Sequence, residues 1–187
     1  CCEFLLPYSN DCIIGIDWGY LSGVSISLPK DISSFGKSYI NTFLNARIFG
    51  TSGSNELSFG DECISTGGMF MGAEFENFGG KLTISDSTLE VNSMFYGSSG
   101  LHHITFKNCE LFGFVDLFTY SDVQNVTFEN CSSSYDFNDY IGCADDVFHK
   151  YMTSLTLKNC DNSLVNIIMN MFDGNEYFKY LEINILD

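Results

Sequence analysis

The chain is poor in basic residues and in proline. Of its 187 residues only 8 are Lys or Arg, against 24 Asp and Glu, so the formal net charge is −16, and Arg47 is the single arginine. Because a surface that holds phosphates needs the opposite sign, the sequence predicts no direct binding of nucleic acid or of an anionic membrane. The 2 prolines beside 17 glycines fit a chain with many tight turns rather than a proline-rich linker.

Long hydrophobic runs are absent as well. No stretch approaches eighteen consecutive apolar residues, so the sequence predicts no transmembrane segment. Apolar residues still make up 45% of the chain and aromatic residues 16%, which excludes a disordered protein in spite of the charge. A chain of this length forms one domain or one repeat array with a substantial core.

A short apolar pair that ends in phenylalanine recurs about every two dozen residues, and a β-like run follows each time. The pairs are Ile48-Phe49, Met69-Phe70, Met94-Phe95, Leu117-Phe118, Val147-Phe148 and Met171-Phe172. The runs are 57–59, 82–84, 104–106, 126–128, 155–157 and 181–183. A period of this length is typical of a repeat solenoid, in which each unit buries its apolar face against its neighbours. The runs should then lie in one parallel sheet, with Ile104, Val126 and Leu155 next to one another.

The best-formed unit reads Leu101-x-x-Ile104-x-Phe106-x-x-Cys109-x-Leu111, which follows the leucine-rich repeat pattern. Together with the preceding Met94-Phe95 and its Gly/Ser turn, this segment resembles the BspA-like leucine-rich repeats. The resemblance covers residues 48–187. It implies a parallel sheet with short helical or irregular returns, a role in protein recognition or adhesion, and no catalytic residues. The alternative is a parallel β-helix.

The two ends of the chain differ in kind. Residues 1–47 do not match the repeat and carry enough apolar side chains to form an N-terminal cap, with helix-compatible spacing over 38–49. Residues 48–187 then form an array of about six repeats. The array ends on an apolar strand, 181–186, without an obvious C-terminal cap. Since an open edge strand invites pairing, an edge-to-edge homodimer through this strand is a possible assembly.

Four of the eight cysteines sit close to one fixed position of the repeat, Cys63, Cys109, Cys131 and Cys160, and Asn precedes the last three. A residue type that is fixed to a repeat register is a packing position, so we expect these four to be buried free thiols rather than disulfides. Free thiols favour an intracellular protein, with the cell surface as the alternative. The pairing of Cys1, Cys2, Cys12 and Cys143 stays open.

Residues that alternate with the apolar positions should form a polar face of the sheet, which the repeat pattern makes concave. The central members of this face are His103, Thr105, Lys107, Asn125, Thr127, Glu129 and Thr156. Acids and lysines nearly balance on it, and Lys107, Glu129 and Lys158 alternate in sign across neighbouring strands. Most of the negative charge therefore belongs to turns, returns and edges.

The longest repeat contains an aromatic and acidic segment that includes Tyr135, Asp136, Phe137, Asp139, Tyr140, Asp145 and Asp146. Insertions in repeat proteins often form the binding face, and aromatic rings beside carboxylates suit Arg- and Lys-rich surfaces. The alternative is that the apolar members pack under the sheet and the acids only contact water.

Motifs for catalysis, cofactors and metals are missing. The sequence holds no nucleophile elbow, phosphate-binding loop or dinucleotide fingerprint, and Asp145 with His149 is a weak metal signal. We therefore expect no enzyme, no cofactor and no metal. The leading expectation is a module that binds a basic protein partner and that inhibits a nucleic-acid-binding protein as a nucleic-acid mimic, by placing carboxylates where phosphates would lie. The alternatives are an adhesion protein that uses the concave face and, less favoured, a β-helix carbohydrate-active enzyme.

Overall fold

The computed structural model describes residues 3–5, 13–14, 25–27, 33–35, 43–50, 55–65, 68–133, 147–173, 178 and 180–187. Side chains are described for 43–50, 56–57, 68–133, 147–173, 178 and 180–187. The strands are β1 (Glu3–Leu5), β2 (Ile13–Ile14), β3 (Ser25–Ser27), β4 (Ser33–Phe35), β5 (Arg47–Phe49), β6 (Asn55–Ser65), β7 (Glu74–Glu76), β8 (Lys81–Glu90), β9 (His103–Phe112), β10 (Asn125–Glu129), β11 (Ser154–Lys158) and β12 (Glu182–Leu186). The helix α2 spans Asn162–Phe172.

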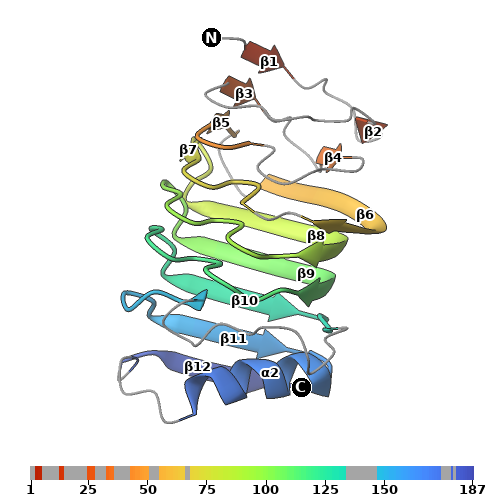
Figure 1. Ribbon diagram of the computed structural model, residues 1–187, viewed down its shortest axis with the longest axis vertical. Coiled ribbons are helices and arrows are strands. Elements are labelled where there is room, and N and C mark those ends of the chain that lie inside the picture. Colours follow the sequence, from red (N-terminus) through yellow and green to blue (C-terminus); the bar gives the residue numbers. More distant parts are fainter. Residues whose placement is uncertain are drawn as a thin grey trace.

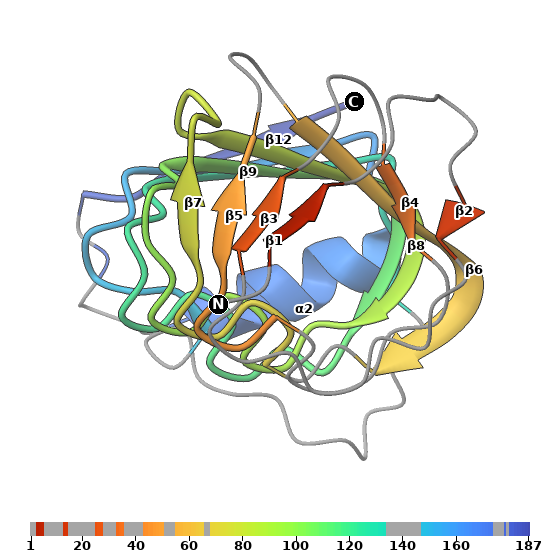
Figure 2. The same ribbon diagram turned by 90° about the horizontal axis from the view of Figure 1, so that it is seen from above.

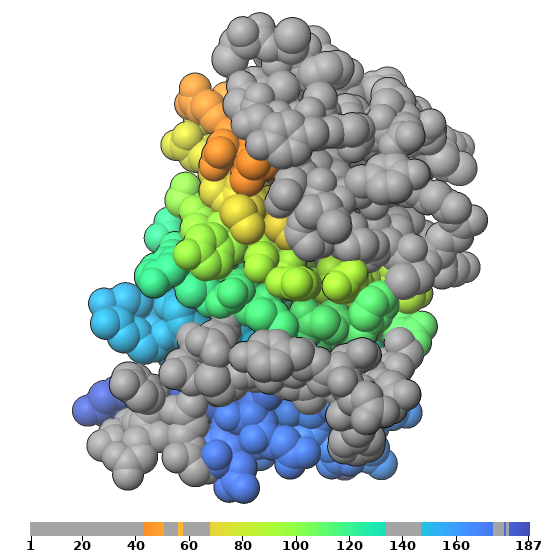
Figure 3. Space-filling view, viewed as in Figure 1, coloured from red at the N-terminus to blue at the C-terminus, as the bar shows by residue number. Residues whose placement is uncertain are grey.

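These strands form two parallel sheets. The large sheet has the order β12-β11-β10-β9-β8-β6-β4-β2, and the small one has the order β1-β3-β5-β7. Figure 1 shows the strands of the large sheet following one another along the long axis of the molecule. In the space-filling view the described segments likewise form bands in sequence order (Figure 3). The predicted parallel sheet is therefore confirmed: the described part of the chain is mostly parallel β-sheet with little helix.

Alternating apolar residues of the large sheet form a shared core. The strand register pairs Val126 with Ile104 on one side and with Leu155 on the other, and all three are buried. The next apolar position pairs Phe106 with Phe128, whose rings stack with centroids 5.4 Å apart. The predicted stacking of Ile104, Val126 and Leu155 is thus confirmed.

The predicted register is wrong by two residues at both ends of the array. Leu57 pairs with Ile84, although the pattern had aligned it with Leu82. At the other end Ile183 pairs with Leu155, where the pattern had placed Leu181. A shift of two keeps the same face of each strand inward, so the alternation alone does not fix the register.

A phenylalanine column runs through the return segments, which join the end of one strand to the start of the next. It consists of Phe43, Phe70, Phe95, Phe118, Phe148 and Phe172, with successive ring centroids 5.3–6.1 Å apart. The backbone N–H groups of Phe43, Phe70 and Phe95 each donate to a carbonyl of the next return. In this unit the member of the column is Phe43, so the prediction for Ile48-Phe49 is wrong: this pair lies in β5 of the small sheet.

The helical expectations are partly met. Residues 43–45 form a turn and 47–49 a strand, so the described part of 38–49 is not helical. Met69-Phe70, Met94-Phe95 and Leu117-Phe118 lie in turns, whereas Met171-Phe172 ends α2. This helix lies in the return between β11 and β12, at the lower end of the molecule in Figure 1. Seen from above, it lies within the outline of the strands (Figure 2), and it buries Leu164, Ile167, Ile168 and Met171.

Strands of both sheets lie on either side of residue 47, since β3 pairs with β5 and β4 with β6. The N-terminal cap over residues 1–47 stays a prediction, because only short strands are described there before Phe43. At the other end β12 is the edge strand of the large sheet, and Ile185 and Leu186 are about half exposed. The homodimer through this strand also stays a prediction.

Candidate functional site: the polar face of the large sheet

All seven residues predicted for the sheet face lie on adjacent strands with their side chains partly exposed. The register pairs Asn125 with His103, Thr127 with Thr105 and Glu129 with Lys107, and it pairs Thr127 with Thr156. Their apolar neighbours along each strand are buried. The structure thus brings the whole predicted face together, and we call these seven residues, with Thr83, Ser154 and Lys158, the sheet face.

The middle column of the sheet face is made of threonine. Thr83, Thr105, Thr127 and Thr156 are paired from strand to strand across β8, β9, β10 and β11. Adjacent strands lie about 4.8 Å apart, so the four threonines follow one another at a regular spacing. Glu56 precedes this row and Asn184 continues it. Ser58 lies outside this column, since it pairs with Ser85.

The outer columns hold the charged and titratable side chains. Lys158 Nζ lies 3.0 Å from Glu129 Oε1, so this member of the predicted alternating pairs is formed. His103 Nε2 lies 3.2 Å from the Thr127 hydroxyl oxygen. Burial, with a smaller contribution from Lys81, lowers the pKa of His103 below its usual value. The face therefore offers hydroxyl, amide and neutral imidazole groups, with its ionic groups close to balance.

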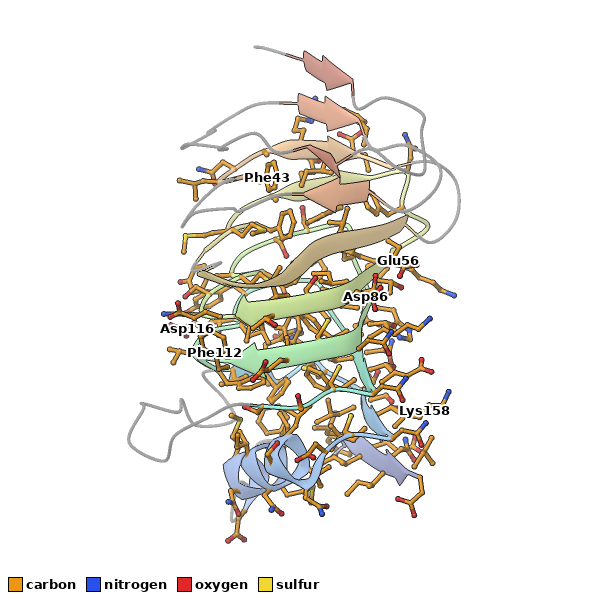
Figure 4. All side chains as sticks on the ribbon, turned by 90° about the vertical axis from the view of Figure 1, so that its right-hand side faces the viewer. Phe43, Glu56, Asp86, Phe112, Asp116 and Lys158 are labelled. Carbon is orange, nitrogen blue, oxygen red and sulfur yellow. The ribbon has the colours of Figure 1, made fainter. Side chains whose placement is uncertain are left out.

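One edge of the sheet face is a corner built from asparagine and aspartate. Asp86, Asn108, Asn130 and Asn159 all have positive φ, between 49° and 54°, where Asn and Asp are favoured over other side chains. The Asn130 amide donates to Asn108 Oδ1 at 3.0 Å, and the Asn108 amide donates to Asp86 Oδ1 at 2.9 Å. Beyond this corner β8 and β9 continue in a second direction, across the face of the molecule that Figure 4 presents.

The cysteine column lies just inside this corner. The thiols of Cys109, Cys131 and Cys160 each contact a carbonyl oxygen of the preceding strand, at 3.2–3.5 Å. Cys109 and Cys131 are buried and free, as predicted, whereas Cys160 is only half-buried. A hydrogen bond with the Cys109 sulfur, together with burial, raises the pKa of Cys131, and burial raises that of Cys160. These two thiols are therefore protonated at neutral pH and are poor nucleophiles. Cys63 belongs to β6, but its side chain lies outside the described set.

The acidic and aromatic segment falls outside the described residues. This applies to Tyr135, Asp136, Phe137, Asp139, Tyr140, Asp145 and Asp146, so their predicted role stays a prediction.

Among the residues that the structure describes, no three His, Cys, Asp or Glu side chains are grouped so that they could hold a metal ion. In the same part of the chain no helix has the length and apolar character needed to cross a membrane.

Three tyrosines near the phenylalanine column were not among the predicted site residues. They are Tyr96, Tyr120 and Tyr151, which follow Phe95, Phe118 and Phe148 by one, two and three residues. Tyr120 and Tyr151 are 77% and 69% exposed, although the phenylalanines before them are buried. The sequence does contain this signal, but the changing distance from the phenylalanine hides it from a search in fixed register.

His149 joins two returns through hydrogen bonds at both ring nitrogens. The Tyr151 N–H donates to Nδ1 at 3.2 Å, so Nδ1 is an acceptor and Nε2 carries the hydrogen, which it donates to the Val123 carbonyl. Burial lowers the pKa of His149, against smaller opposing effects of the Val123 carbonyl and Asp122. The neutral ring is therefore the form that fits the folded protein.

Acidification is expected to destabilise the protein through this ring. Because its pKa in the folded state lies below the unfolded value near 6.5, protonation favours the unfolded chain. The contribution is present above about pH 6.5 and is lost as the pH falls through that value toward the lowered folded pKa. Melting temperatures between pH 5 and 8 should rise with pH, and His149→Gln should flatten the curve. His103→Gln should remove the contribution of His103 to the pH dependence of the melting temperature, since burial lowers its pKa as well. If the plots of melting temperature against pH for both variants run parallel to the wild-type plot, this account is wrong.

Comparison with family models, with curated proteins and with solved structures found no match for this chain. The assignment of function therefore rests on the geometry and the charge of the chain itself.

Proposed function

We propose that the chain is a non-enzymatic binding module of the leucine-rich repeat kind, which recognises a protein partner with a basic surface. The regular register of β8, β9, β10 and β11 and the phenylalanine column support the repeat architecture. In such a fold each unit contacts only its neighbours, and long exposed surfaces serve for recognition.

The distribution of charge is the observation that favours a basic partner. On the described sheet face lysines and carboxylates nearly balance, and Glu129 already pairs with Lys158. The net charge of the whole chain is nevertheless −16, so its excess of acid lies elsewhere. Described examples on the returns are Asp116, Asp122 and Asp173. A field of this sign attracts a basic partner and speeds its association, and it repels nucleic acid.

A sharper form of the proposal is inhibition of a nucleic-acid-binding protein. Carboxylates on the returns and in the segment from Tyr135 to Asp146 would then occupy the positions that phosphates take in the natural complex. Such binding should weaken with salt, because exposed charges are screened beyond about 8 Å at physiological ionic strength.

Charge reversal of Asp136, Asp139, Asp145 and Asp146 to lysine is expected to weaken binding of a basic probe by at least about tenfold. The probe is a fluorescent peptide of nine arginines, and its dissociation constant is measured by anisotropy at two salt concentrations. The matched control is Thr105→Ser with Thr127→Ser, which changes the sheet face without changing its charge. Unchanged affinity in the fourfold variant would remove the acidic segment from the site, and failure of the wild type to bind would overturn the proposal.

The second candidate function is adhesion through the sheet face, and the column of register-paired threonines favours it. In that case binding to a cell-surface protein should be insensitive to salt and should be lost in Thr127→Glu. A salt-sensitive interaction that survives this substitution would exclude it.

A further inference from the structure

Tyr120 stands at a backbone position that does not suit a tyrosine. The equivalent residues of the preceding returns are Asn45, Gly72 and Gly97, since the Asn45 N–H donates to Met71 O, that of Gly72 to Tyr96 O and that of Gly97 to Thr119 O. All four have positive φ, 50°, 65°, 64° and 59° in chain order. Asn and Gly adopt this conformation readily, whereas a bulky aromatic residue there is an outlier.

Packing does not explain the tyrosine. Its side chain is 77% exposed, so the strained backbone conformation is not offset by burial in the core. Its ring meets that of Tyr96 edge to face, with centroids 5.3 Å apart. A residue that is kept at a cost to stability and left open to solvent is a candidate for binding.

Two neighbouring returns add to this surface. We call Tyr96, Tyr120 and Tyr151 the tyrosine edge, since they lie on the successive returns that lead into β9, β10 and β11. The strands β9, β10 and β11 follow one another along the long axis of the molecule (Figure 1). Tyr151 is 69% exposed, and Lys150 Nζ lies 5.0 Å from its ring centroid. The ammonium group of Lys150 thus already makes a cation–π contact with the Tyr151 ring.

Two aspartates belong to the same return as Tyr120, four residues before it and two residues after it. Asp116 Oδ1 accepts a hydrogen bond from the Thr119 hydroxyl at 3.3 Å, and Asp122 Oδ2 accepts one from the Gly100 N–H at 3.2 Å. Asp122 is exposed and lies close enough to His149 to act on its charge. Each carboxylate has a further oxygen with which it can accept a charge-assisted hydrogen bond from a guanidinium group.

From this geometry we infer that the tyrosine edge is the docking site for arginine side chains of the basic partner. The inference rests on the proposed function and adds to it the surface and the chemistry of contact. A guanidinium group stacks on the exposed face of Tyr120 or Tyr151 and hydrogen-bonds to Asp116 or Asp122. The net charge of −16 selects a cationic segment over a neutral ligand such as a sugar, which could also stack on tyrosine rings.

The substitution Tyr120→Gly separates binding from folding. Glycine fits the positive φ, as Gly72 and Gly97 do, so the melting temperature should stay the same or rise. Binding of the nine-arginine peptide should weaken about three- to tenfold, and further when Tyr151→Ser is added. The control is Tyr180→Ser, another exposed tyrosine, which lies just before β12 and should leave the affinity unchanged. Tyr120→Asn, which copies Asn45, serves as a second variant should glycine prove disruptive.

Three results would contradict the inference, and each points to a different explanation. Equal affinity in wild type and Tyr120→Gly, with a loss in the fourfold aspartate variant, would remove the tyrosine edge and leave the proposed function standing. A lowered melting temperature in both Tyr120→Gly and Tyr120→Asn would assign the tyrosine a structural role. Binding of a neutral oligosaccharide, lost in Tyr120→Gly while peptide binding persists, would replace the cation as the occupant.

Discussion

Phe95→Ala is expected to lower the free energy of unfolding by about 3–5 kcal/mol. Phe95 is 0% exposed and lies in the middle of the phenylalanine column, with ring centroids 5.3 Å from Phe70 and 5.8 Å from Phe118. Its removal takes away buried apolar surface and leaves a cavity between two returns that cannot close independently. Equilibrium unfolding in urea gives the value directly.

The matched control for this variant is Phe112→Ala. Phe112 ends β9 and is only half-buried, so its loss should cost clearly less. Figure 4 shows Phe112 near Asp116, at the side of the molecule opposite Asp86 and Lys158. Equal losses for the two variants, or a loss below about 1 kcal/mol for Phe95→Ala, would mean that the column is not the main packing element.

Asn108→Ala is expected to cost about 2–3 kcal/mol, although the side chain is exposed. Alanine at φ 54° costs about 1–2 kcal/mol, and the two amide hydrogen bonds to Asp86 and Asn130 are lost as well. Asn108→Gly keeps the backbone conformation and loses only the hydrogen bonds, so it should cost about 1 kcal/mol. Guanidinium unfolding of the two variants separates the contributions. Identical losses would show that the positive φ carries no cost here.

Much of the large sheet was predictable because alternation with period two is a strong signal. All six predicted β runs lie in or overlap strands, from Leu57 in β6 to Ile183 in β12. The register at the ends was not predictable from the same signal, since a shift of two leaves the inward face unchanged. Leu57 against Ile84 is one case.

The small sheet was missed because its strands are too short to show a pattern. β7 reads Glu-Phe-Glu, and its only apolar residue is Phe75. The helix α2, by contrast, could have been predicted. Its buried Leu164, Ile167, Ile168 and Met171 have helical spacing, and Asp161 accepts a hydrogen bond from the Ser163 N–H as an N-cap. Met171-Phe172, which ends this helix, also fits the recurring apolar pair, so the repeat pattern alone does not reveal the helix.

The sheet face could be predicted residue by residue, because strand alternation decides which side chains point outward. Tyr120 could not be predicted as a site, because its significance lies in a backbone angle that only the structure supplies. The same holds for the ring position of Lys150 relative to Tyr151, since residues adjacent in sequence need not be in contact.

The corner amides also give the protein a polarity. Each side-chain amide donates a hydrogen bond to the corner residue on the preceding strand: Asn130 donates to Asn108, and Asn108 donates to Asp86. The amide dipoles of the row therefore point the same way. The Asp86 carboxylate accepts the hydrogen bond from Asn108, and its negative charge meets the positive end of the aligned dipoles.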